Sequence, residues 1–254
     1  MTRVHQKRRP VGALFAAGLA VVLANPAAGY RPFDSTDAAV AEKGKCELEL
    51  GPVEFQRIGE TSSLLVPKTV LNLGVARNWE IVVEGSHVRR LGDVDGETRS
   101  SLVDTGLFAK GVIREGSLQE KSGLSVAIET GPLLPTVNGE SGTGFSFAAI
   151  FSQRWKAATA HLNATVERTR AGSVAFVGGL IVEGSEDHPI RPVAELVVER
   201  ESGAESTVSV LVGAIYRLRE NLSFDAAVRA ARIGGANGME IRAGLTWAFD
   251  LRGK

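Results

Sequence analysis

The sequence predicts an all-β protein, an antiparallel up-and-down transmembrane β-barrel of about 12 strands. Three observations predict this fold: an export signal at the start of the chain, long segments of alternating apolar and polar residues, and no second apolar run long enough for a helical span. Inside a bilayer every backbone polar group must be paired, and only helices and closed barrels achieve this. The mature chain can therefore span a membrane only as a barrel.

The first 29 residues have the three parts of a secretory signal peptide. Four basic residues and no acidic one occur among the first nine, and an apolar run of 14 residues, Val11–Ala24, follows. Small residues then lead to Gly29, so we expect cleavage there or one residue earlier. A membrane-spanning helix needs about 20 residues, which makes a retained anchor the weaker alternative.

From residue 45 onward the hydrophobic pattern has a period of two, which is typical of strands. In the last segment Ile241, Leu245 and Trp247 share one face, while Glu240 and Arg242 share the other. We expect strands at residues 45–57, 66–76, 79–90, 102–114, 122–131, 143–155, 158–169, 173–184, 189–201, 206–218, 222–233 and 238–249. They are 10 to 13 residues long. This exceeds the five or six residues usual in soluble proteins and suffices for the about 9 to 11 that a tilted strand needs to cross a bilayer.

The chain therefore divides into a signal peptide (1–29), a periplasmic N-terminal segment (30–44), a transmembrane barrel (45–249) and a C-terminal tail (250–254). Bacterial barrels have short periplasmic turns and longer external loops. The tightest junctions follow the second, sixth and tenth predicted strands, and the longer polar stretches follow the third and fifth. This parity places the end of the last strand in the periplasm of a Gram-negative cell, with the barrel in the outer membrane.

The last predicted strand carries Arg242, Gly244, Trp247 and Phe249 at a spacing that resembles the terminal insertion signal of outer-membrane barrels. The resemblance implies recognition by the barrel-assembly machinery, with an aromatic pair at the periplasmic interface. An ordinary amphipathic strand is the alternative. The chain continues for five residues past Phe249, where many barrels stop.

Motifs spread over most of residues 30–249 resemble an outer-membrane transporter family labelled "meta-pathway of phenol degradation". They are Tyr30–Ala38, Gly44–Gly51, Val103–Lys110, Leu134–Thr136, Gly142–Gly144 and Ala160–Asn163. The resemblance implies a cargo of aromatic or other small hydrophobic compounds.

Composition excludes several other classes of protein. The 29 basic and 29 acidic residues balance, the mature chain is mildly acidic, and no concentrated basic patch marks a nucleic-acid partner. A lone cysteine, Cys46, cannot form an internal disulfide. The sequence has no phosphate loop, no paired Cys or His at metal spacing and no nucleophile elbow, so we expect no enzyme, no cofactor and no metal.

Two polar groups could still carry chemistry. His161, Asn163 and Glu167 share a strand face with residue types that outer-membrane lipases use, but that face is predicted to line the lumen. His87 precedes Asp93 and Asp95 at an external rim, where an exposed loop explains them equally well.

Polar faces that would be costly to bury unpaired predict a wet or ion-paired lumen. The lumen-facing candidates are Asp104, Phe108, Lys110, Arg114, Glu129, His161, Glu167, Glu195, Arg217, Asp225, Arg229, Glu240 and Arg242. Their mixed signs predict no strong ion selectivity. We expect a hydrophobic route to need an apolar patch among Phe108, Val112, Leu211 and Ile215.

These features favour a passive channel for small solutes, hydrophobic or aromatic ones among them, with the lipid bilayer as a partner. Two alternatives stay open: a structural barrel filled by its own salt bridges, and a soluble periplasmic β-protein that binds a small ligand.

Overall fold

The computed structural model describes residues 30–92 and 99–251 of the chain. The expected signal peptide (1–29) lies outside the described residues, as do Asp93 and Asp95. Among the described elements one is helical, the short 3-10 helix η1 (Ser117–Gln119), and the others are strands. No helix in the described ranges is long and apolar enough to span a membrane.

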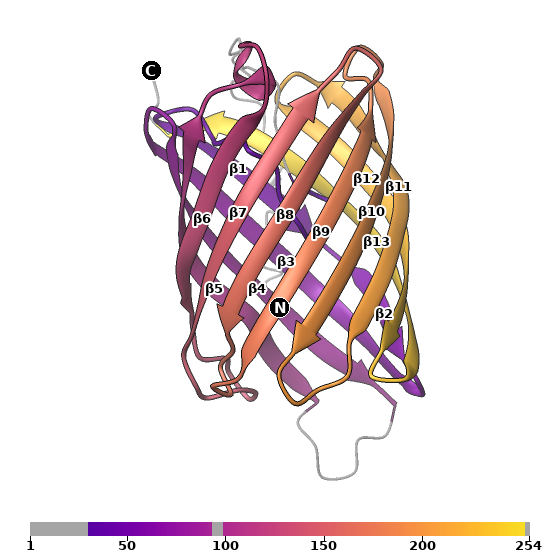
Figure 1. The fold of residues 1–254 in the computed structure, drawn as a ribbon. Coiled ribbons are helices and arrows are strands. Elements are labelled where there is room, and N and C mark those ends of the chain that lie inside the picture. Colours follow the sequence, from indigo (N-terminus) through magenta and orange to yellow (C-terminus); the bar gives the residue numbers. More distant parts are fainter. Residues whose placement is uncertain (1–29, 93–98, 252–254) are drawn as a thin grey trace, which may run out of the picture.

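The strands close into an antiparallel barrel (Figure 1). They are β1 (Lys45–Gly51), β2 (Glu54–Ile58), β3 (Thr61–Ala76), β4 (Trp79–Leu91), β5 (Ser100–Arg114), β6 (Ser125–Leu133), β7 (Gly144–Arg154), β8 (Ala158–Arg168), β9 (Val174–Gly184), β10 (Ile190–Glu201), β11 (Thr207–Arg219), β12 (Leu222–Ile233) and β13 (Ala236–Asp250). Both β1 and β2 pair with β13 on one side and β3 on the other. They are two halves of one strand, so the wall has 12 strands and the predicted fold class is confirmed.

The largest difference from the predicted bounds is at β3, which begins at Thr61 rather than residue 66. The register of β3 against β4 shifts between Leu65 and Lys68, and Pro67, which has no backbone N–H, lies within that interval. The irregularity interrupts the alternation of apolar and polar residues. The first five residues of β3 therefore do not continue the pattern by which the strand was predicted.

The two faces of the wall have opposite character. In β11, Val208, Val210 and Val212 are exposed on the outside, whereas Ser209 and Leu211 between them are buried. An antiparallel sheet in water places its apolar face inward. This barrel presents its apolar face outward, as a wall surrounded by lipid does.

The barrel has two different ends. The terminal rim contains the start of β1, the end of β13 and the turns at 77–78, 155–157 and 220–221. The loop rim, at the opposite end, contains the connections at 59–60, 134–143, 169–173, 202–206 and 234–235.

Candidate solute path

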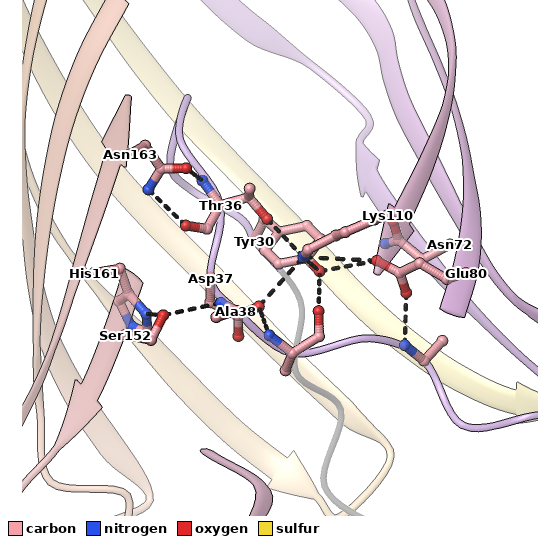
Figure 2. Close-up of polar contacts among 12 residues, drawn as sticks. Tyr30, Thr36, Asp37, Ala38, Asn72, Glu80, Lys110, Ser152, His161 and Asn163 are labelled. Atoms are coloured by element: carbon pink, nitrogen blue, oxygen red, sulfur yellow. Dashed lines mark hydrogen bonds and ion pairs between the residues drawn. The ribbon is translucent and has the colours of Figure 1, made fainter. Parts of the chain in front are cut away.

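The N-terminal segment, residues 30–44, runs inside the barrel (Figure 2). Arg31, Pro32, Phe33 and Ala38 are buried although they belong to no strand. The sequence predicts a periplasmic segment here, but in the structure residues 30–44 lie within the lumen. Alternation locates strands, but a coil without periodicity gives no signal of where it runs.

Lumen side chains hold the backbone of this segment by hydrogen bonds. The carboxylate of Glu195 accepts the backbone N–H groups of Asp34 (3.0 Å) and Ser35 (2.7 Å). Asn163 accepts the N–H of Thr36 at 3.2 Å and donates from Nδ2 to the Thr36 carbonyl at 2.7 Å. Further along, Glu80 accepts the N–H of Ala41 at 2.6 Å. These side chains satisfy backbone groups that no neighbouring strand pairs.

Lys110 is a buried cation surrounded by groups of the segment. Its ammonium group is fully buried, donates to the hydroxyl of Thr36 at 3.0 Å, and donates to the hydroxyl of Tyr30 (Figure 2). Carboxylates of Asp37 and Glu80 lie 3.4 and 3.6 Å away. A buried charge is costly unless it is paired. The segment supplies three of the four groups that pair with the Lys110 ammonium, and Glu80 of the wall supplies the fourth.

Arg31 holds the start of the segment against strands β1, β2 and β12. Its guanidinium forms ion pairs with Glu54 (2.6 Å) and Asp225 (3.2 Å), and its backbone N–H donates to Glu49 at 3.1 Å. A Cβ atom at Gly244 would collide with the guanidinium. The glycine of the predicted insertion signal therefore also makes room for Arg31.

Asp34 reaches a cluster of cations on neighbouring strands. Its carboxylate lies 2.8 Å from Arg242, 3.0 Å from Arg229 and 3.8 Å from Lys68. Glu240 pairs with both arginines. Burial raises the pKa of Asp34, but these cations outweigh it and hold the pKa well below its usual range. Asp34 is therefore ionised at neutral pH.

Ser152, His161 and Glu183 form a hydrogen-bonded chain in the lumen. Ser152 Oγ lies 2.8 Å from His161 Nδ1, and His161 Nε2 lies 3.0 Å from Glu183. A nucleophile, a base and an orienting acid can occur in this order. Here Ser152 is fully buried and its oxygen accepts the N–H of Ala38 at 2.9 Å, so the geometry positions the segment.

His161, Asn163 and Glu167, which the sequence places on one strand face, do not form a common site, because each has a different partner. Asn163 binds Thr36, and Glu167 accepts the hydroxyl of Ser146 at 3.0 Å. At the other suspected group, His87 lies against the carbonyl of Val66.

Apolar contacts complete the docking of the segment. Phe33 belongs to a buried cluster with Ile181, Val193, Leu211, Ile215 and Ala227. Phe108 lies in a separate cluster with Val82 and Leu133. Of the expected apolar patch, the structure brings Leu211 and Ile215 together beneath Phe33, and it leaves Phe108 and Val112 elsewhere in the lumen.

The segment divides the lumen into two cavities. The terminal-side cavity, about 650 Å³, is lined by segment residues 37–43 and by turn residues of the terminal rim. The loop-side cavity, about 470 Å³, is lined by segment residues 30–36 and by strand residues nearer the loop rim. The segment therefore lies between the two cavities, with one cavity toward each rim.

The remaining lumen-facing candidates take three positions. Asp104, Glu129 and Glu167 line the loop-side cavity, and Arg217 lines the terminal-side cavity. Arg114 departs from the expectation. The register shift between Val112 and Arg114 pairs it with Val126, which lies on the outward register, so its exposed side chain sits at the terminal rim outside the lumen.

The aromatic rings of the insertion signal, Trp247 and Phe249, contact each other with centroids 4.9 Å apart.

Several groups of the network between segment and wall were not among the predicted site residues: Arg31 and Asp34 in the segment, Glu49, Glu54, Glu80 and Ser152, which contact the segment directly, and Glu183, which contacts it through His161 and Ser152. Those in the strands have the same inward register as the candidates that were chosen, so parity alone could have found them. The two segment residues carried no such signal.

The fold and lumen define a class: a closed β-barrel of the outer-membrane type. The outer membrane channel of the COG4313 group from Pseudomonas putida F1 matches 85% of this chain and 100% of its own, with a TM-score of 0.63 at 10% identity. The NanC porin matches 80% and 98% (TM-score 0.57, 7% identity). The translocator domain of the autotransporter NalP from Neisseria meningitidis matches 82% and 90% (TM-score 0.53, 12% identity).

These likenesses establish the fold. No family model and no curated protein matches the chain. Membership of the family labelled "meta-pathway of phenol degradation" therefore remains a prediction from the sequence motifs.

Proposed function

We propose that the chain is a passive outer-membrane channel for small solutes, hydrophobic or aromatic ones among them, and that the N-terminal segment closes its lumen. The observation that carries this proposal is the polar, segment-filled lumen within an apolar wall, with a cavity on each side of the segment. A soluble ligand-binding barrel would need the reverse arrangement, with an apolar interior and a polar exterior. The Ser152 group, which holds the segment, gives no support to an enzyme.

The loop-side cavity supports the choice of solute. Val70, Val82, Phe108 and Leu133 line one part of it, and carboxylates such as Glu84 and Glu129 line another. A volume of about 470 Å³ falls within the range of roughly 300–1,000 Å³ that holds small ligands. A small aromatic molecule could rest on the Phe108 surface, but it could pass onward only when the segment moves.

Solute uptake by liposomes that contain the refolded barrel tests this proposal. Phe108→Asp places a charge on the apolar surface, so we expect uptake of a small aromatic compound to fall by more than uptake of a small sugar. Phe108→Leu keeps the surface apolar and should leave the ratio of the two rates close to that of the unmodified protein. Equal losses for both solutes in Phe108→Asp would contradict a route over Phe108.

A structural barrel without conduction is the second candidate, and the number of ion pairs between segment and wall favours it. A mature chain that starts at Glu42 lacks residues 30–41 of the segment and separates the two candidates. The channel proposal predicts faster uptake by this variant than by the complete mature chain. If neither admits any solute, the structural barrel is the better account.

A further inference from the structure

Five arginines stand on the outside of the barrel, all at the loop rim. Each lies within the last three residues of the strand that carries it and is exposed. They are Arg57 in β2, Arg89 in β4, Arg168 in β8, Arg200 in β10 and Arg232 in β12.

The strand register fixes their direction. Residues paired across neighbouring strands point to the same side of a sheet. The arginines pair with large apolar residues of the outer face: Arg168 with Phe145, Arg200 with Phe176, Arg232 with Val208, and Arg57 with Met239. Phe145 and Phe176 are 52% and 59% exposed, so this face is outside the barrel. Arg89 pairs with Leu64, which pairs with Phe55 on the same face.

None of these five arginines has a carboxylate partner among the described residues. Arg57 donates to the carbonyl of Gly59 at 3.3 Å, and Arg232 donates to the amide oxygen of Asn237 at 2.8 Å. The carboxylates of the described strands lie on the inward register, at strand ends, or at the bulge of β5. Inside the lumen, by contrast, Arg242 has both Asp34 and Glu240.

The terminal rim also carries exposed arginines, but it adds a group of aromatic rings on its outer side. Trp79, Trp155, Tyr216 and Trp247 are exposed there. Aromatic rings of this kind sit at the headgroup level of a bilayer. Guanidinium groups instead present a planar fork of donors that matches phosphate oxygens. The two rims therefore fit two lipid surfaces of different chemistry.

We propose that the five arginines dock the phosphate groups of lipopolysaccharide, the phosphorylated glycolipid of the outer leaflet. The acyl chains of the glycolipid lie against Phe145, Phe176 and Val208, directly beside three of the guanidinium groups. Arg168, Arg200 and Arg232 stand on alternate strands, roughly 10 Å apart around the rim, so one glycolipid can reach two of them. The loop rim then faces the outside of the cell. This inference rests on the outer-membrane location in the proposed function.

Binding of fluorescent, doubly phosphorylated lipid A to the folded barrel in an uncharged detergent tests the inference. We expect the triple variant Arg168→Gln, Arg200→Gln, Arg232→Gln to bind at least about tenfold more weakly at low salt. The matched control is Arg77→Gln, Arg114→Gln, Arg219→Gln, which removes three exposed arginines from the terminal rim. Its affinity should stay within about twofold of the unmodified protein.

Three results would overturn the inference: equal affinity in the two triple variants, equal binding of lipid A without its phosphates, or equal binding of phosphatidylglycerol. Full competition by millimolar inorganic phosphate would also overturn it, because it would reveal bare anion binding. If the first triple variant fails to fold, Arg200→Lys keeps the charge and loses the fork, and it should still weaken binding. Solute uptake is measured on the same preparations. A barrel that binds lipid A but admits no solute, with or without residues 30–41, refutes the proposed function alone, whereas normal uptake without arginine-dependent binding refutes this inference alone.

Discussion

The inner and outer faces of the same strands handle charge in opposite ways. On the inner face, Lys110 is fully buried and has four partners, three of them from the N-terminal segment. On the outer face, arginines such as Arg168 and Arg200 are exposed and have no carboxylate partner among the described residues. The lumen therefore completes its ion pairs with a segment of its own chain. The outer arginines remain available to an external anion, which is the basis of the proposed lipopolysaccharide site.

Removing a cation from each face should give the largest contrast. Lys110→Met leaves the carboxylates of Glu80 and Asp37 without their cation, and breaking a buried pair in this way costs about 3–5 kcal/mol. Arg89→Met on the outer face should change the free energy of unfolding by less than about 0.5 kcal/mol in uncharged lipid. Urea unfolding of both variants in the same vesicles measures the difference. Equal losses would show that the lumen network carries no special stability.

Adding a cation should reverse the contrast between the faces. Val212 is 57% exposed in the middle of β11, so Val212→Arg should cost about 2–4 kcal/mol in a bilayer. Thr165 lines the loop-side cavity together with Glu129 and Glu167, so Thr165→Arg gains carboxylate neighbours and should cost less than about 1 kcal/mol. The same unfolding experiment checks both values. A larger loss from Thr165→Arg would mean that the two faces have been assigned the wrong way round.

Substitutions at the neighbouring glycines Gly178 and Gly179 test the docking of the segment, with a smaller expected effect on the free energy of unfolding. A Cβ at Gly179 would collide with Ser35, whereas a Cβ at Gly178 would have its nearest neighbour, the carbonyl of Val198, at 4.0 Å. Overpacking of this kind costs about 1–3 kcal/mol, and displacement of the segment relieves it. We expect Gly179→Val to speed solute uptake and Gly178→Val to leave it unchanged. Unchanged uptake in both would indicate that the segment does not limit passage.

The strands could be read from the sequence because alternation is a local signal. Residues 222–233 were predicted as a strand, and β12 has the same bounds. Inward-facing groups such as Glu195 and Arg242 could also be chosen by parity. Their partners could not, because those lie in a coil up to 210 residues away in sequence, as in the hydrogen bond from Arg242 to the carbonyl of Pro32. Only closure of the barrel brings the two together.

Arg114 shows a different limit of sequence reasoning. Parity assigned it to the lumen, but a one-residue shift in a strand moves a side chain to the other face. The irregularity between Val112 and Arg114 does this at the end of β5. Such a bulge depends on how the partner strand pairs, so it cannot be predicted from the pattern of residues within β5.

A disulfide between the segment and the wall tests the central claim, that the N-terminal segment closes the channel, most directly. A Cβ at Gly179 would lie 2.9 Å from the Cβ of Ser35, and a shift of about 1 Å gives the separation of a disulfide. Ser35→Cys and Gly179→Cys are combined with Cys46→Ser, which removes the one native thiol. The account predicts little solute uptake by liposomes when the pair is oxidised and restored uptake after reduction. Equal uptake in the two states would contradict it.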